Sequence, residues 1–178
     1  MQAIMSAALS APSHATRRIV ALAAVVFALD QFTKWLVLHT IYPGDEIPVI
    51  PGFFNLAHRA NTGAAWSLFT GNNTMLALVA LVALVALFLA RRQFHSERLT
   101  GQLALGLIFG GIIGNLIDRL LPGRHAVVDF LHFYLLRRGG EPLDFPAFNV
   151  ADSAICTGVA LIFIINLRNE SAPKPVAN

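Results

Sequence analysis

Two acidic residues, Asp129 and Asp152, have the residue type and the setting for hydrolytic chemistry. Asp129 lies in the short apolar run VVDF at 127–130, and Asp152 follows Asn149 by three residues. Two carboxyl groups within hydrogen-bonding distance cannot both ionise cheaply, so they share one proton. The charged carboxylate can then act as a general base on a water molecule, while the protonated one polarises a carbonyl group. A fold that brings these residues together could therefore hydrolyse a peptide bond.

Asp152 also has a structural interpretation, which the sequence leaves open. Asn149 is a typical N-cap residue, and Asp152 could return a hydrogen bond to the backbone of Asn149, as in a capping box. A helix N-terminus favours the charged form of an acid. In a pair with Asp129 we therefore expect Asp152 to be the ionised member.

A second polar group lies within apolar segments, where an ionisable side chain costs about 2.5–3.5 kcal/mol on insertion scales. Asp30 and Lys34 are four residues apart, with the acid first, which is the favourable order for an ion pair on one helix face. A neutralised structural pair explains these two residues at least as well as a direct part in catalysis.

A third polar group continues two rows of small residues. One row, at steps of four, is Gly106, Gly110, Gly114 and Asp118, and the other is Gly111, Asn115 and Arg119. Small residues on one stripe allow close approach of another helix. We expect Asp118 to be a structural partner of the Asp30 and Lys34 pair. Asn115 and Arg119 remain candidates for binding a ligand.

The elements that must position these residues are helices that cross a membrane. Of 178 residues, 56% are hydrophobic and 13% are charged, against about 25% charged residues in a soluble domain; the mean hydropathy is +0.62. Such helices satisfy their own backbone groups within lipid. Four apolar segments are long enough, namely Ile19–His39, Thr74–Ala90, Leu103–Leu121 and Val150–Leu167.

Basic residues near the ends of the spans predict their orientation. Seven fall on one side: Arg17, Arg18, Arg91, Arg92, Arg98, Arg168 and Lys174. Four fall on the other: Arg59, Arg124, Arg137 and Arg138. We therefore expect both termini in the cytoplasm and the two longer connections outside. The net charge of +3 is scattered, so a nucleic-acid partner is not expected.

The predicted fold is an all-α polytopic membrane protein with a small external element. A disordered leader at 1–16 precedes one membrane domain at 17–168 and a cytoplasmic tail at 169–178. In the outer connections, segments 47–50, 53–57 and 130–136 have strand-like patterns between turn residues. Short strands on the membrane surface and a solvated coil fit these patterns about equally well.

Other kinds of site have less support. The six histidines form no HExxH pattern, so a zinc peptidase is not expected, and neither a metal nor another cofactor is predicted. The single cysteine, Cys156, has no histidine near it in sequence, and we expect it to be a buried packing residue.

Five polar motifs, taken together and in this order, resemble the bacterial lipoprotein signal peptidases, or signal peptidase II. They are DQFTK at 30–34, NTGAAWS at 61–67, GGIIGNLIDR at 110–119, VVDF at 127–130 and FNVADS at 148–153. The resemblance extends from about Arg17 to Leu167. It implies an aspartic endopeptidase of the bacterial inner membrane, with its active site on the periplasmic side.

The resemblance also implies a substrate, a set of site residues and an inhibitor. The substrate is a prolipoprotein in the membrane lipid, cleaved before a cysteine that carries a diacylglyceryl group. The catalytic dyad falls on Asp129 and Asp152. Supporting or substrate-binding residues fall on Asp30, Lys34, Asn61, Gly63, Asn115, Asp118, Arg119 and Asn149. The family is inhibited by globomycin, and we expect a monomer. The turn-prone segment 61–63 suggests a movable flap or an ordinary surface turn.

A different class of function competes with this one. Asp30, Lys34, Asp118 and Arg119 could form a relay across the membrane in a small proton-coupled transporter or channel. The crowding of the polar residues near one side of the membrane argues against such a relay.

Overall fold

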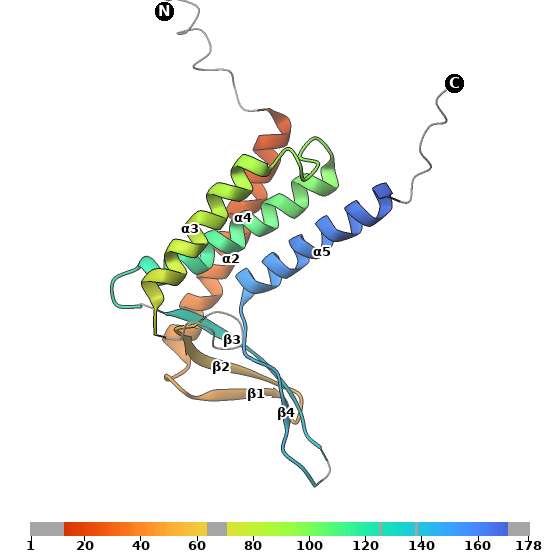
Figure 1. The fold of residues 1–178 in the computed structure, drawn as a ribbon. Helices are drawn as coiled ribbons and strands as arrows, with labels where there is room; N and C mark the ends of the chain where they lie inside the picture. Colours follow the sequence, from red (N-terminus) through yellow and green to blue (C-terminus); the bar gives the residue numbers. More distant parts are fainter. Residues whose placement is uncertain (1–12, 64–70, 125, 138, 171–178) are drawn as a thin grey trace, which may run out of the picture.

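Four helices form a bundle, with a small sheet at one end (Figure 1). The computed structural model describes residues 13–63, 71–124, 126–137 and 139–170. The helices are α2 (His14–Thr40), α3 (Asn73–Ala90), α4 (Leu99–Leu120) and α5 (Val150–Glu170). Each is long and apolar enough to cross a membrane. The prediction of four spanning helices is therefore confirmed.

The first and last helices extend into the segments expected to be a leader and a tail. Residues 1–12 of the expected leader lie outside the described residues, and α2 already begins at His14. The Ser13 hydroxyl caps α2 by accepting a hydrogen bond from the backbone N–H of Thr16 at 3.2 Å. At the other end α5 continues to Glu170, and residues 171–178 are not described.

Helix α4 lies at the centre and packs against the other three helices. Its glycines allow these close contacts on two faces. A Cβ on Gly110 would lie 2.7 Å from the carbonyl oxygen of Ala23 on α2, and one on Gly111 would lie 2.5 Å from that of Ala151 on α5. The predicted role of the glycine rows in close helix packing therefore agrees with the structure.

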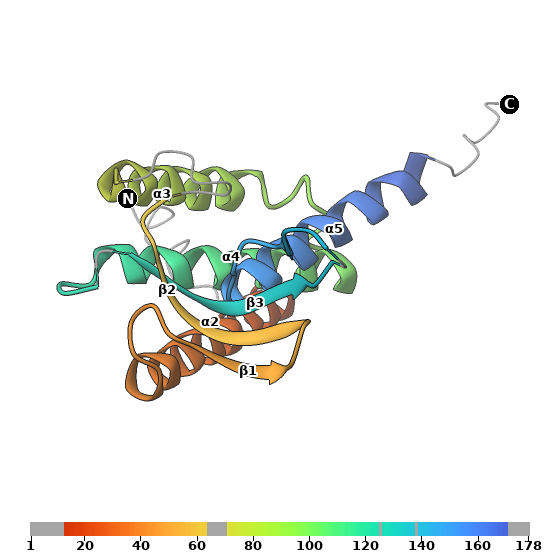
Figure 2. The same ribbon diagram turned by 90° about the horizontal axis from the view of Figure 1, so that it is seen from below.

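The sheet is antiparallel and has the strand order β1-β2-β3-β4. Its strands are β1 (Glu46–Ile50), β2 (Phe54–Asn61), β3 (Val127–Leu135) and β4 (Leu143–Asp144). Figure 2 shows β1, β2 and β3 crossing beneath the helices. Of the two interpretations of the outer connections, short strands are thus the correct one.

Apolar contacts fix the sheet to the bundle. Val37 and Ile41, at the end of α2, form a buried cluster with Val128 and Phe130 of β3. Ahead of α5, the backbone N–H of Phe148 donates to the carbonyl of Leu131 at 3.1 Å, while the Phe148 carbonyl accepts from β3. The next residue begins the turn into α5, so this pairing positions the start of α5 beside β3.

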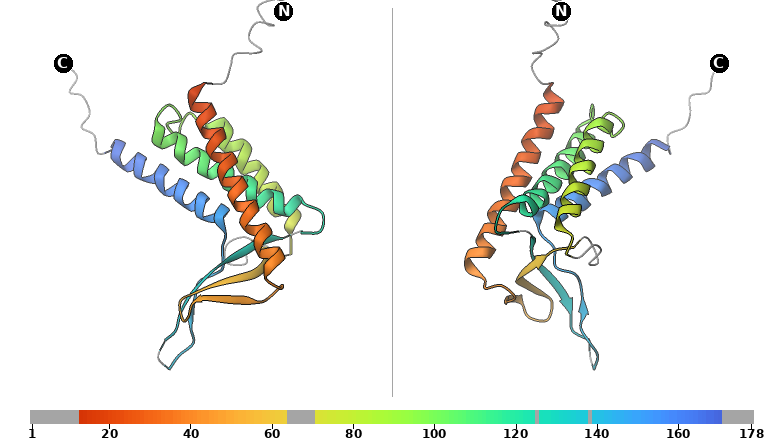
Figure 3. Two further views of the ribbon diagram at one scale, coloured as in Figure 1. Left: turned by 180° about the vertical axis from the view of Figure 1, so that it is seen from behind. Right: turned by 60° about the vertical axis from the view of Figure 1, so that its left-hand side comes forward.

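Helix α5 packs along α4 and diverges from α2 toward its C-terminal end (Figure 3). Its inner face is formed by Ala151, Ala154 and Gly158, which are buried at steps of three and four residues. Cys156 lies two residues from both Ala154 and Gly158, on the opposite face, and is exposed. The prediction that Cys156 is buried was wrong, because the apolar helix has a narrow contact face and the remainder faces lipid.

Candidate active site

Asp129 lies on β3, buried at the junction of the sheet and the bundle. The β2 strand has a bulge between Leu56 and Arg59, which places Arg59 opposite Asp129 in the register. Two amide side chains hold the Asp129 carboxyl group. Asn61 Nδ2 donates to Oδ2 at 2.8 Å, and Asn149 Nδ2 donates to Oδ1 at 2.7 Å. Both donors are neutral, so they orient the acid without supplying a counter-ion.

Asp152 forms the capping box that the sequence allows. The Asp152 backbone N–H donates to Asn149 Oδ1 at 2.9 Å, and the Asn149 backbone N–H donates to Asp152 Oδ2 at 3.2 Å. The capping role does not separate Asp152 from Asp129, because the same Asn149 side chain also contacts Asp129. The structure thus brings both acids to one asparagine.

Asn115 occupies the centre of the polar network rather than an open position. Its Nδ2 donates to Asp152 Oδ1 at 2.7 Å. Its Oδ1 accepts from Lys34 Nζ at 3.0 Å and from Asn149 Nδ2 at 3.2 Å. Because Lys34 can only donate, it fixes the orientation of this amide and turns the NH₂ group toward Asp152.

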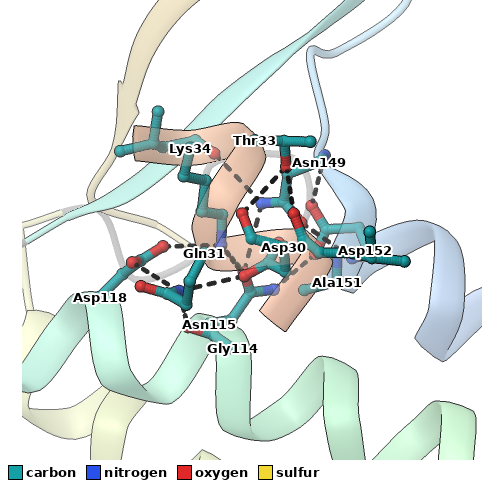
Figure 4. Close-up of polar contacts among 12 residues, drawn as sticks. Asp30, Gln31, Thr33, Lys34, Gly114, Asn115, Asp118, Asn149, Ala151 and Asp152 are labelled. Carbon is teal, nitrogen blue, oxygen red and sulfur yellow. Dashed lines mark hydrogen bonds and ion pairs between the residues drawn. The ribbon is translucent and has the colours of Figure 1, made fainter. Parts of the chain in front are cut away.

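A cluster of charges lies next to this amide (Figure 4). Lys34 Nζ lies 2.8 Å from Asp30 and 2.7 Å from Asp118, and none of these three side chains has exposed surface. Arg124 adds a second cation 2.6 Å from Asp118. The cluster therefore holds two acids and two bases, and the predicted association of Asp118 with Asp30 and Lys34 is present.

The cluster also joins three helices. Asp30 on α2 accepts a hydrogen bond from the backbone N–H of Ala151 on α5 at 3.0 Å. The Gln31 side chain donates to Asp30, to Asp118 and to the carbonyl of Gly114 on α4, each at 3.2 Å. Sequence reasoning overlooked Gln31 and Arg124 as members of this network. A polar residue within an apolar segment was the available signal for Gln31.

Arg119 lies outside that cluster. Its guanidinium group donates to Asn73 Oδ1 at 3.0 Å and to the carbonyl of Gly63 at 2.8 Å. The Gly63 backbone N–H donates to Asn61 Oδ1 at 2.8 Å, which closes an Asx turn. Arg119 therefore links α4, the start of α3 and the end of β2. Residues 64–67 of the NTGAAWS motif lie outside the described residues.

The surroundings of Asp129 change its proton affinity. Burial, followed by the neighbouring charge of Asp152, raises the pKa of Asp129 to about 7, although the amides of Asn61 and Asn149 act in the opposite direction. Asp129 therefore carries a proton over most of the weakly acidic range, a property that the proton-sharing hypothesis requires.

A second polar group, on the sheet, was missed at the sequence level. His132 lies between two acids, with Nδ1 3.0 Å from Glu46 and Nε2 2.6 Å from Asp144. Glu46 also accepts hydrogen bonds from Arg59 and Asn55. Partial burial opposes ionisation of Glu46, but these partners lower its pKa to about 2. The group links β1, β2, β3 and β4, and it explains how the short β4 strand is held.

The described residues contain no group of three or more His, Cys, Asp or Glu side chains that could hold a metal ion. They also lack a continuous charged path through the bundle. The close helix contacts below Gly114 involve Ala23, Val26 and Ile155, and the Arg119 guanidinium group hydrogen-bonds to Asn73 and Gly63. The apolar contacts in this part of the bundle do not favour a relay of charges across it.

Comparisons with known proteins agree with this arrangement. Residues 22–168 match the family model described as signal peptidase (SPase) II, an aspartic peptidase family. The chain is 44% identical to a lipoprotein signal peptidase of Geobacillus thermodenitrificans, covering 80% of this chain and 85% of the relative. It is 38% identical to that of Bacillus subtilis, covering 86% and 95%.

Solved structures show the same fold. A bacterial membrane enzyme determined by the in meso method at 2.3 Å superposes with a TM-score of 0.77 and is 36% identical, covering 90% of this chain and 93% of that one. A second, at 1.9 Å, gives a TM-score of 0.70 and 38% identity, covering 84% and 92%. The protein is thus a multi-pass membrane enzyme, and its chain belongs to the signal peptidase II family of aspartic peptidases.

Proposed function

We propose that this chain removes signal peptides from diacylglyceryl-modified prolipoproteins by cutting before the lipidated cysteine, with Asp129 and Asp152 as the catalytic dyad. One observation carries the proposal: Asp129, which is buried, and Asp152, which is partly buried, share Asn149 and are held by amides, whereas the neighbouring Asp30 and Asp118 are ion-paired with Lys34. Among the described residues no cation forms an ion pair with Asp129 or Asp152, and this arrangement favours one shared proton between the two carboxyl groups.

The proposed reaction uses the two acids in different protonation states. Ionised Asp152 takes a proton from a water molecule, whose oxygen attacks the scissile carbonyl carbon. Protonated Asp129 donates a hydrogen bond to the carbonyl oxygen and stabilises the charge that develops there. The proton on Asp152 then passes to the leaving amine as the C–N bond breaks. The free carboxyl group stays on the signal peptide, and the amino group stays on the lipidated cysteine.

The other polar residues position this pair. Asn61, Asn115 and Asn149 hold the two carboxyl groups at 2.7–2.8 Å. Lys34 orients Asn115, and Asp30 with Asp118 neutralises Lys34. We propose that Arg119 and Gly63 position the outer connection next to the scissile bond, because the Arg119 guanidinium group contacts the Gly63 carbonyl. These roles reduce the freedom of the reacting groups before the substrate binds.

We further propose that the enzyme is a monomer in the inner membrane, with both chain termini in the cytoplasm and the sheet on the periplasmic side, as the basic residues predict. Helix α2 begins and α5 ends opposite the sheet (Figure 1), and Arg17, Arg18 and Arg168 lie in the terminal turns of those helices. The dyad then lies on the periplasmic side. A prolipoprotein could enter laterally from the lipid, and globomycin would compete for the same site.

The test is cleavage of two matched substrates by the purified protein. One prolipoprotein carries the diacylglyceryl group on its cysteine, and the other has the same sequence without the lipid. We expect cleavage of the modified substrate alone, immediately before the cysteine, and inhibition by globomycin. Equal cleavage of both substrates, or cleavage at another bond, would contradict the proposed specificity.

A further inference from the structure

An open groove runs along the bundle between α2 and α3, and none of the polar residues of the candidate active site lines it. In the described part of the chain, the backbones of α2 and α3 do not approach each other, and both helices pack against α4. The space between them has a volume of about 520 Å³. Its walls are apolar, with Ile19, Ala24 and Phe27 from α2, Phe88 from α3 and Ile113 from α4.

The mouth of this groove has a different chemistry. Arg91 and Arg92 line it, together with the hydroxyl residues Ser13, Thr16 and Ser96. The Arg91 guanidinium group lies 4.2 Å from the centre of the Phe88 ring and donates to the Phe88 carbonyl, so it is held at the edge of the apolar walls. Among the described residues that line the groove, none is acidic.

The dimensions match one leaflet of a membrane. Ile19 and Phe27 are eight residues apart on α2, which corresponds to about 12 Å along a helix. One leaflet provides about 15 Å of hydrocarbon. Arginine at the level of the headgroups binds phosphate through charge-assisted hydrogen bonds. We propose that this groove binds one anionic phospholipid, with an acyl chain along α2 and the phosphate at Arg91 and Arg92.

Charge and position favour a lipid over the signal helix of a substrate. Signal peptides carry a positively charged segment ahead of their apolar core. That segment would meet the two arginines at the mouth, which repel it. The groove is also separated from the candidate site, because α2 and α4 close together at Gly110 and Gly114. None of the residues proposed for catalysis lines the groove.

The experiment measures lipid retained by the full chain in native mass spectrometry after release from nanodiscs. The nanodiscs contain equal amounts of dioleoyl phosphatidylglycerol, which is anionic, and dioleoyl phosphatidylcholine, which has the same acyl chains and a zwitterionic headgroup. We expect one retained phosphatidylglycerol, preferred at least about tenfold over phosphatidylcholine. The double variant Arg91→Gln/Arg92→Gln should lose this preference, and Ala24→Phe should lose the bound lipid by filling the groove.

Two matched variants separate the groove from general surface effects. Arg17→Gln/Arg18→Gln removes the same charge at the same end of the bundle. Ala21→Phe adds the same ring at an exposed position. None of these three residues lines the groove. Both should retain the lipid, and signal-peptide cleavage by every variant checks folding. Equal retention of the two lipids, equal losses in the matched variants, or displacement of the lipid by uncleaved prolipoprotein would overturn the proposal.

Discussion

Two pairs of acids lie within one network of this protein, three of them buried and Asp152 partly buried, and the two pairs are stabilised in opposite ways. Asp30 and Asp118 each form an ion pair with Lys34, and Arg124 adds a second cation at Asp118. Asp129 and Asp152 are held by the amides of Asn61, Asn115 and Asn149. The first pair is neutralised internally. In the proposed mechanism the second pair shares a proton, because amides orient its two carboxyl groups and neither acid forms an ion pair with a described cation.

The comparison explains why so many polar residues surround the proposed catalytic pair. An isolated ion pair in an apolar bundle contributes little net stability, since desolvation offsets the attraction. Here the ion cluster also positions an amide: Lys34 orients the side chain of Asn115, which donates a hydrogen bond to Asp152. The buried charges thus support the site by fixing an amide whose two ends would otherwise be interchangeable.

The largest expected effect comes from removing the shared proton. Asp129→Asn and Asp152→Asn keep the size of each side chain but cannot exchange a proton between them. Each variant should lose at least about 10³-fold in cleavage of the lipid-modified prolipoprotein, within the range found for acid-base groups. Each should still insert, melt near the wild-type temperature and bind globomycin. Near-normal cleavage by either purified variant would reject the dyad.

Removing the central cation should instead reduce stability. Lys34→Met leaves Asp30 and Asp118 buried without their shared counter-ion, and we expect a loss of about 3–5 kcal/mol in the free energy of unfolding. Thermal or denaturant unfolding in detergent measures it. The matched variant Arg124→Met should lose less, because the Arg124 side chain is 21% exposed. Equal losses in both variants, or none in Lys34→Met, would contradict the role of Lys34.

The two pairs should also differ in their response to pH. Burial and the Asp152 charge raise the pKa of Asp129 to about 7, so cleavage should fall about tenfold per pH unit above that value as the shared proton is lost. Because the pKa of Asp129 is higher in the folded state than in the unfolded state, protonation of Asp129 stabilises the fold at low pH. This stabilisation is lost as the pH rises from about 4 to about 7. Asp129→Asn should flatten this part of the melting profile. Equal pH dependence of the melting temperature in the wild type and in Asp129→Asn would contradict the raised pKa of Asp129.

The smallest expected effect comes from removing the side-chain amide of Asn61. Asn61 lowers the pKa of Asp129 by donating to its carboxylate, so Asn61→Ala should move the alkaline decline in cleavage upward by about one pH unit. Asn55→Ala is the matched control, because Asn55 lies on the same strand and donates to Glu46 instead. A shift of equal size in both variants would indicate a general change in the sheet.

The sequence was most informative where composition and spacing act locally. Apolar length defined the four helices, and steps of four residues along α4 identified the glycine contacts and Asp118. The interval from Asn149 to Asp152 predicted the capping box. Each of these signals is contained within one segment, so it does not depend on how distant segments meet.

Contacts between distant segments were harder to predict. The bulge in β2 and the pairing of Phe148 with Leu131 bring Asn149 beside Asp129, and neither has a clear sequence signal. Arg124 was counted as a basic residue of a loop, although it completes the ion cluster. Cys156 was assigned to the core because small apolar residues are usually buried, but in a membrane the exposed face is apolar too.

The most direct test of the account is an infrared titration of the Asp129 carboxyl group, identified by difference from Asp129→Asn. In the wild-type enzyme the protonated carboxyl band should persist at pH 6 and disappear near pH 7 to 8. In Asp152→Asn the same transition should occur at lower pH, because the neighbouring negative charge is gone. A carboxylate already fully ionised at pH 6, or an identical transition in both proteins, would contradict a proton shared between the two acids.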